Sequence, residues 1–78
     1  MPTVLRSGPY SFRFYASDGV EPPHVHVHRE NMRAKFWLDP VKLEKSKRFS
    51  DRELNRIKRL IIANQVYLLE RWDEFFLL

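Results

Sequence analysis

The chain has 78 residues, of which 44% are hydrophobic and 31% charged, and this composition is typical of one folded domain. Because it has no cysteine, disulfides, thiolate nucleophiles and cysteine-ligated zinc are excluded, and two glycines are too few for the familiar nucleotide-binding loops. No stretch approaches the roughly 20 apolar residues of a membrane span, and residues 1–6 lack the apolar core of a signal peptide. We therefore expect a cytoplasmic protein without a membrane partner.

The formal net charge of +4 is unevenly distributed along the chain. Residues 1–50 hold nine Lys and Arg against five Asp and Glu, whereas residues 51–78 hold five of each kind. A basic surface of this kind suits nucleic acid, an acidic protein partner or plain solubility.

The first half of the chain predicts a sheet. Large apolar residues alternate with polar ones over 10–15, 24–28 and 32–38, the period of a strand with one buried face. A turn cluster at 7–9 separates the first of these from Val4-Leu5-Arg6, and 17–23 is a loop with Asp-Gly turn chemistry and a Pro pair. Residues 41–43 could add a short edge strand, and we expect 44–49 to be a charged connector.

The last part of the chain predicts one long helix. Ser50 and Glu53 have the spacing of a capping box, and no Pro or Gly follows before the end. One stripe of a helix from Asp51 to about Phe76 holds the apolar residues Leu54, Ile57, Ile61, Leu68, Trp72 and Phe75. The expected fold is α+β: a mainly antiparallel sheet of four strands, or of five, packed on one long C-terminal helix.

The length of this helix predicts an interface. It would measure roughly 39 Å, whereas strands of five to seven residues span about 17–23 Å, so a straight helix would overhang the sheet. Its end would then expose an apolar patch, which favours a homodimer or a small partner protein. The residues expected at this interface are Val66, Leu69, Trp72, Phe75 and Phe76. The alternative is a helix that bends to cover a larger core.

The face of the sheet opposite the helix predicts a binding surface. If Phe12, Val25 and Phe36 face the helix, the alternation places a basic, aromatic and histidine-rich set on the other face. That set is Arg13, Tyr15, His24, His26, His28, Arg33, Lys35 and Trp37. Cations that bind phosphates and rings that stack on bases are combined in platforms for single-stranded nucleic acid. An ordinary solvated face is the alternative.

His24, His26 and His28 have the most unusual spacing in the chain. Successive members lie roughly 6.6 Å apart on one strand face, so two of them can share a metal, whereas the outer pair, about 13 Å apart, cannot. His24 and His26 are thus candidate ligands of zinc or another divalent transition metal, with Asp39 or Glu21 as further candidates; no cofactor is required. The same two histidines could instead act as general acid and base in a metal-independent ribonuclease, helped by Arg13 or Lys35.

Several motifs carry a resemblance that spans nearly the whole chain. The most specific is Pro22-Pro23-His24-Val25-His26-Val27, accompanied by residues 1–6, Phe12-x-Phe14-Tyr15, 34–38 and Glu70-x-Trp72. With these the chain resembles a family of small bacterial proteins, the domain-of-unknown-function family 4160. The resemblance implies a cytoplasmic bacterial protein encoded beside another small domain, a pairing sometimes interpreted as a toxin–antitoxin module. It implies no activity, substrate or cofactor, and His28 is an addition to its pattern.

The sequence as a whole favours a small interaction module over an enzyme. We expect one member of a toxin–antitoxin-like pair that binds a partner protein through the helix end and RNA through the sheet face. The ribonuclease and the His-ligated metal domain remain the alternatives.

Overall fold

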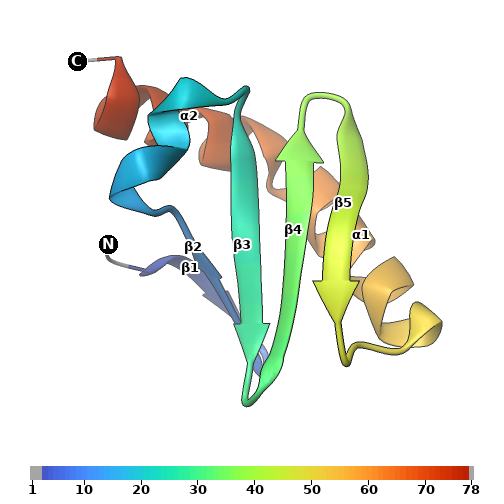
Figure 1. Ribbon diagram of the computed structural model, residues 1–78. Helices are drawn as coiled ribbons and strands as arrows, with labels where there is room; N and C mark the ends of the chain where they lie inside the picture. Colours follow the sequence, from blue (N-terminus) through green and yellow to red (C-terminus); the bar gives the residue numbers. More distant parts are fainter. Residues whose placement is uncertain (1–2, 78) are drawn as a thin grey trace.

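The computed structural model describes residues 3–77, which form a five-stranded sheet with two helices on one of its faces (Figure 1). Every neighbouring pair of strands is antiparallel, and the strands follow one another across the sheet in chain order. The elements are β1 (Thr3–Ser7), β2 (Tyr10–Arg13), the 3₁₀ helix η1 (Ala16–Val20), β3 (His24–Arg29), β4 (Met32–Leu38), β5 (Val41–Lys47), α1 (Asp51–Ala63) and α2 (Gln65–Phe76). The predicted α+β class and antiparallel sheet are confirmed.

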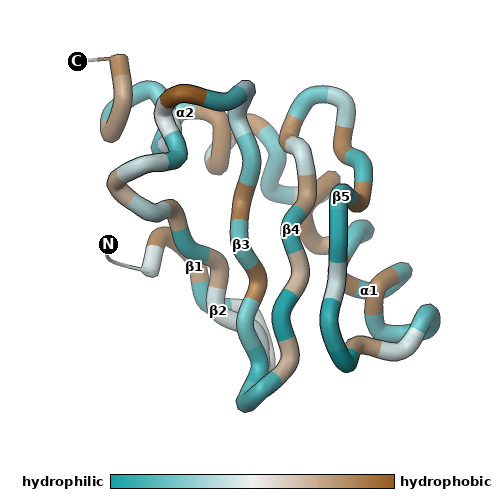
Figure 2. Tube along the Cα trace, in the orientation of Figure 1, coloured by the Kyte–Doolittle hydropathy of each residue, from teal (hydrophilic) through white to brown (hydrophobic). Residues whose placement is uncertain are grey.

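The core lies between the sheet and the helices and follows the predicted alternation. Phe12, Val25 and Phe36 from three neighbouring strands are at most 1% exposed. They pack with the buried helix residues Ile57 and Ile61. The alternation of hydropathy along β3 and β4 can be followed in Figure 2. Because successive side chains of a strand point to opposite faces, burying one set commits the other to the far side of the sheet.

Strand β5 is longer than the predicted edge strand. Residues 44–47, expected in a connector, belong to β5, where 45–47 pair with 33–35 of β4, and only residues 48–50 separate β5 from α1. The strand is hydrophilic along most of its length (Figure 2), and past Val41 its residues are exposed. An edge strand is held by backbone hydrogen bonds to one neighbour and needs no apolar alternation, so charged residues suit it.

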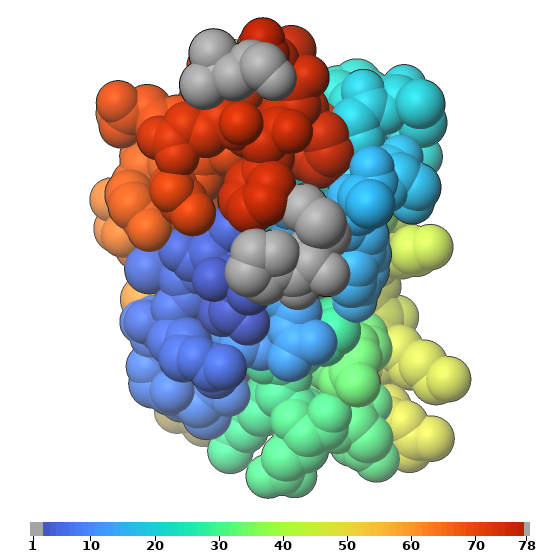
Figure 3. Space-filling model, turned by 90° about the vertical axis from the view of Figure 1, so that its left-hand side faces the viewer, coloured from blue at the N-terminus to red at the C-terminus, as the bar shows by residue number. Residues whose placement is uncertain are grey.

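The prediction of one long helix is wrong. The helix begins at Asp51, where the Ser50 hydroxyl accepts a hydrogen bond from the Glu53 amide as expected, but it is interrupted at Asn64 (φ −116°, ψ 18°). After the interruption, α2 packs its aromatic end on the sheet: Trp72 lies edge-on to Phe14, with ring centroids 5.3 Å apart. Figure 3 shows the end of α2 beside the η1 segment. The bent helix therefore covers more of the core.

No helix within residues 3–77 combines the length and the apolar composition needed to cross a membrane.

Candidate functional site

Basic side chains form cross-strand rows on the face of the sheet opposite the helices. Residues directly opposite each other in an antiparallel pair share a face, so the strand register assigns the members of each row. The first row is Arg13, His26, Lys35 and Lys45. The second row is Ser11, His28, Arg33 and Lys47. The lysines of β5, which the sequence analysis assigned to a connector, extend both rows by one strand.

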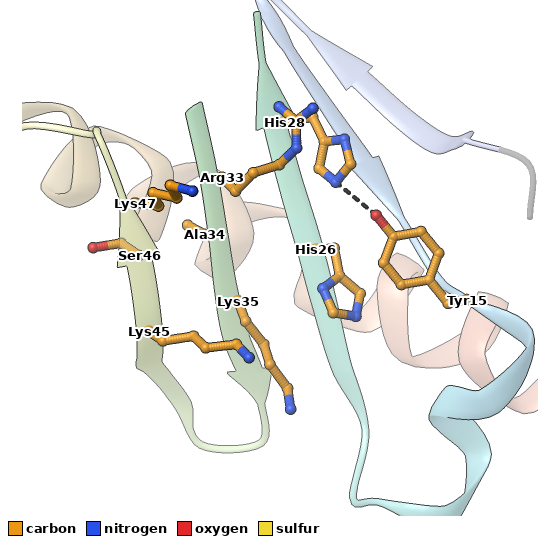
Figure 4. A pocket seen from close by; sticks show the side chains of 9 residues that line it. All are labelled: Tyr15, His26, His28, Arg33, Ala34, Lys35, Lys45, Ser46 and Lys47. Atoms are coloured by element: carbon orange, nitrogen blue, oxygen red, sulfur yellow. Dashed lines mark hydrogen bonds between the residues drawn. The ribbon is translucent and has the colours of Figure 1, made fainter. Parts of the chain in front are cut away.

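The members of the two rows on β3, β4 and β5 line a groove of about 370 Å³, which we call the basic groove (Figure 4). Its lining contains no acidic residue. The residues that line it are Tyr15, His26, His28, Arg33, Ala34, Lys35, Lys45, Ser46 and Lys47. Five of the eight predicted binding residues line the groove, together with Lys45 and Lys47 of β5. These five are Tyr15, His26, His28, Arg33 and Lys35.

The cations of the basic groove differ in how far they are neutralised. Lys35 is 9% exposed, and its Nζ lies 2.6 Å from a carboxylate oxygen of Glu21. Arg33 donates to two main-chain carbonyls of its own turn, and Lys45 and Lys47 are exposed. Within residues 3–77, no carboxylate lies within ion-pair distance of Arg33, Lys45 or Lys47. These three side chains therefore carry the uncompensated charge of the groove.

Tyr15, His26 and His28 form the wall of the basic groove that faces the lysines of β5 (Figure 4). The Tyr15 hydroxyl is hydrogen-bonded to His28 Nε2 at 2.8 Å, and its ring centroid lies 4.4 Å from that of His26. Burial, together with the nearby charges of Arg33 and Arg13, lowers the pKa of His28 to about 4. His28 is therefore neutral at pH 7, and the positive charge of the groove comes from Lys and Arg.

Arg13 and Trp37 lie outside the lining of the basic groove. Arg13 is half-buried in the first row. Trp37 borders a second hollow, with Pro22 and Pro23, and the Lys35 ammonium sits 4.8 Å from its ring centroid. The structure therefore does not bring Trp37 together with Tyr15 as one stacking surface.

Asp18, His24 and His26 form a separate cluster, the His/Asp cluster, between η1 and the start of β3. One ligand atom from each residue lies within 4.8 Å of the others. The Asp18 carboxylate is 3.1 Å from His24 Nε2 and 3.2 Å from His26 Nε2. The Tyr15 amide donates a hydrogen bond of 2.7 Å to the Asp18 carboxylate and so fixes it in this position.

His24 is buried, whereas the sequence predicted a solvent-exposed side chain on the face of the sheet opposite the helix. Its side chain is 1% exposed, because Trp72 of α2 and Trp37 of β4 pack against its ring at centroid distances of 5.2 and 5.6 Å. Its Nδ1 is 2.9 Å from the Pro22 carbonyl oxygen, whereas its buried Nε2 has no partner with hydrogen-bond geometry among residues 3–77. A ring so enclosed cannot act on a polymer as a general acid or base, so the geometry does not favour the ribonuclease alternative.

The charge state of the cluster follows from its surroundings. Burial alone would raise the pKa of Asp18, but the hydrogen bond from the Tyr15 amide and the closeness of the two imidazoles outweigh it and lower that pKa. Burial lowers the pKa of His26 by more than the Asp18 carboxylate raises it. An ionised carboxylate thus faces a predominantly neutral imidazole at pH 7.

Sequence reasoning missed Asp18 as a member of this cluster. Of the two carboxylates considered, Glu21 pairs with Lys35, and Asp39 borders the second hollow. The signal that was available is the Asp-Gly pair in the loop: η1 and the Pro pair lead the chain back, so the loop carboxylate meets the start of β3. Only the folded loop reveals this proximity.

The residues expected at a partner interface are mostly covered by this chain itself. Trp72 is 3% exposed, and Leu69, Phe75 and Phe76 pack against the core. Val66 alone among the five is well exposed, at 72%. The overhanging apolar end from which the interface was inferred is thus absent from residues 51–77.

The chain was compared with protein families, with curated proteins and with solved structures, and only the first comparison gives a match. No curated protein and no solved structure matches the chain. The family model described as Domain of unknown function (DUF4160) matches residues 10–73, a range that includes β2 to β5, α1 and most of α2. The chain therefore belongs to the DUF4160 family.

Proposed function

We propose that this protein binds single-stranded RNA along the basic groove. The observation that carries the proposal is the arrangement of Arg33, Lys45 and Lys47, three cations without a carboxylate partner among residues 3–77. Arg33 lies directly opposite Lys47, and Lys35 directly opposite Lys45. Like charges directly opposite each other destabilise a sheet, and a bound polyanion would remove that repulsion.

The arrangement suits a polymer better than a single small anion. The two rows run across β3, β4 and β5, and successive members on one strand face are about 6.7 Å apart. Lys and Arg that contact phosphates bind without reading sequence, so we expect little base preference. Tyr15, half-buried at the wall of the groove, offers the edge of a ring beside which a base can pack.

The experiment is a titration of a fluorescent single-stranded RNA at several salt concentrations. The groove variant combines Arg33→Gln, Lys45→Gln and Lys47→Gln. Each phosphate contact on a single strand adds about 0.7 to the magnitude of the negative slope of log K against log salt. We therefore expect the variant to bind more weakly and the magnitude of its slope to be smaller by about 2.

The matched control removes three positive charges from the exposed face of α1 instead. It combines Arg52→Gln, Lys58→Gln and Arg59→Gln. This variant should keep the slope of the unmodified protein. Equal losses of RNA affinity in both variants would mean that net charge alone explains the binding. Tighter binding of a poly-glutamate peptide than of RNA would indicate an acidic protein partner instead. Either result contradicts the proposal.

The role in a toxin–antitoxin-like pair stays a prediction. The basic groove is compatible with it because binding RNA on one face leaves the helical face free for a second protein. The exposed Val66 and Ile62 lie on that face, at 72% and 54% exposure.

A further inference from the structure

We infer that Asp18, His24 and His26 form a binding site for a divalent transition metal of the zinc type. The inference stands on the His/Asp cluster and does not depend on RNA binding. Its first support is distance. Ligand atoms of a tetrahedral zinc ion lie about 3.3 Å from one another, and the Asp18 carboxylate is 3.1 Å from His24 Nε2 and 3.2 Å from His26 Nε2. Small rotations of side chains that already face one another would complete the ligand shell.

The second support is the buried Nε2 of His24. A carbonyl oxygen can only accept a hydrogen bond, so the 2.9 Å contact with Pro22 places a proton on Nδ1. In the neutral ring, Nε2 then presents a lone pair to the Asp18 carboxylate, and two acceptors face each other in a buried space. Within the part of the chain that the structure describes, Nε2 has no partner with hydrogen-bond geometry. A metal ion between the two atoms would resolve this conflict, as would a proton on Nε2, and the zinc titration distinguishes the two.

The third support is that two of the three residues, His24 and Asp18, are oriented by hydrogen bonds with the backbone. Metal-bound histidines usually donate their other ring N–H to a carbonyl or carboxylate, as His24 does to Pro22. Asp18 accepts a hydrogen bond from the Tyr15 amide, which orients its carboxylate toward the two rings. The orientation of these two residues is therefore set by the backbone at Tyr15 and Pro22.

The donor set selects the class of metal. Two imidazole nitrogens and one carboxylate oxygen suit Zn²⁺, Co²⁺ or Ni²⁺, whereas Mg²⁺ and Ca²⁺ prefer ligand shells made of oxygen. Three protein ligands leave a fourth position for water or another donor. His26 belongs both to the cluster and to the lining of the basic groove, so the metal would lie at the edge of that groove.

The experiment measures metal binding directly, on the full chain without a histidine tag and in the absence of RNA. Zinc is titrated by calorimetry at pH 7, and Co²⁺ is titrated while its visible absorption is recorded. We expect one metal per chain, the absorption bands of a four-coordinate Co²⁺ and a higher melting temperature with zinc. Asp18→Asn and His26→Gln should each weaken binding at least about tenfold.

The matched control is His28→Gln, which removes a histidine of the same strand that lies outside the cluster. It should bind zinc like the unmodified chain, and circular dichroism should show that all three variants are folded. The inference is overturned if the unmodified chain gives neither heat nor absorption, because the cluster is then an imidazolium–carboxylate pair. It is also overturned if His28→Gln loses as much affinity as Asp18→Asn, because the metal then binds to surface histidines.

Discussion

Single carboxylates join distant segments of this small domain. Asp18 links η1 to the start of β3, and Glu53 links α1 to the sheet. The Glu53 carboxylate accepts from the Tyr10 hydroxyl at 2.9 Å and from the Arg29 guanidinium at 2.7 Å. The predicted capping box is therefore only half used: Ser50 caps the helix, while the carboxylate of Glu53 binds residues of β2 and β3.

Glu53 is expected to contribute to acid sensitivity. The Tyr10 hydrogen bond, followed by the Arg29 pair, lowers its pKa below the ordinary 4.5. The carboxylate therefore stabilises the fold in full above pH 4.5, and this contribution is lost as the pH falls through the lower folded-state pKa. Urea unfolding between pH 7 and pH 3 should show a weaker pH dependence for Glu53→Gln. Glu70→Gln, the charge-matched control, should show the same pH dependence of stability as the unmodified protein. If Glu53→Gln also showed that same pH dependence, this role of Glu53 would be contradicted.

At the level of elements, the interruption at Asn64 decides where α2 packs. The Asn64 amide reaches the carbonyls of Leu60 and Ile61, its side chain donates to Leu60, and its own carbonyl accepts from Leu68. Asn64 thus provides hydrogen-bond partners both for carbonyl groups at the end of α1 and for an amide at the start of α2. Leu68 then faces the core and is fully buried, whereas Val66, two residues earlier, is exposed.

This orientation of α2 gives a direct test. Leu68→Ala removes fully buried methyl groups and should lower the free energy of unfolding by about 2–5 kcal/mol. Val66→Ala removes methyl groups that are largely in water and should change it by less than about 0.5 kcal/mol. Chemical unfolding of both variants measures the difference. Comparable losses would mean that α2 is rotated relative to the sheet, as in an uninterrupted helix.

The sequence predicted the elements whose causes are local. Alternation gave the buried faces of β2, β3 and β4, and Ser50 gave the start of α1. A bent helix was the alternative, but the position of the break at Asn64 could not be predicted because no Pro or Gly marks it; the packing that follows the break, Trp72 on Phe14, joins residues far apart in the sequence. The burial of His24 has the same cause, since Trp72 covers it. The closeness of His24 and His26 could thus be predicted from the strand, whereas the loop residue that joins them in the His/Asp cluster, Asp18, was missed.

The whole molecule separates two kinds of surface across one sheet. The helices and the apolar core occupy one face, and the cross-strand rows of cations occupy the other (Figures 1 and 4). The His/Asp cluster joins η1 to the start of β3, and the η1 segment lies beside the end of α2 (Figure 3). Because the two faces are distinct, RNA and a partner protein would not compete for the same residues.

The central claim is that RNA occupies the basic groove, and the most direct test is to map where it binds. We would record backbone amide resonances of the labelled protein while adding a short single-stranded RNA. The account predicts that shifts concentrate on β3, β4 and β5, with the largest changes around Arg33, Lys45 and Lys47. Shifts confined to α1 and α2, or no saturable shifts at low salt, would contradict it.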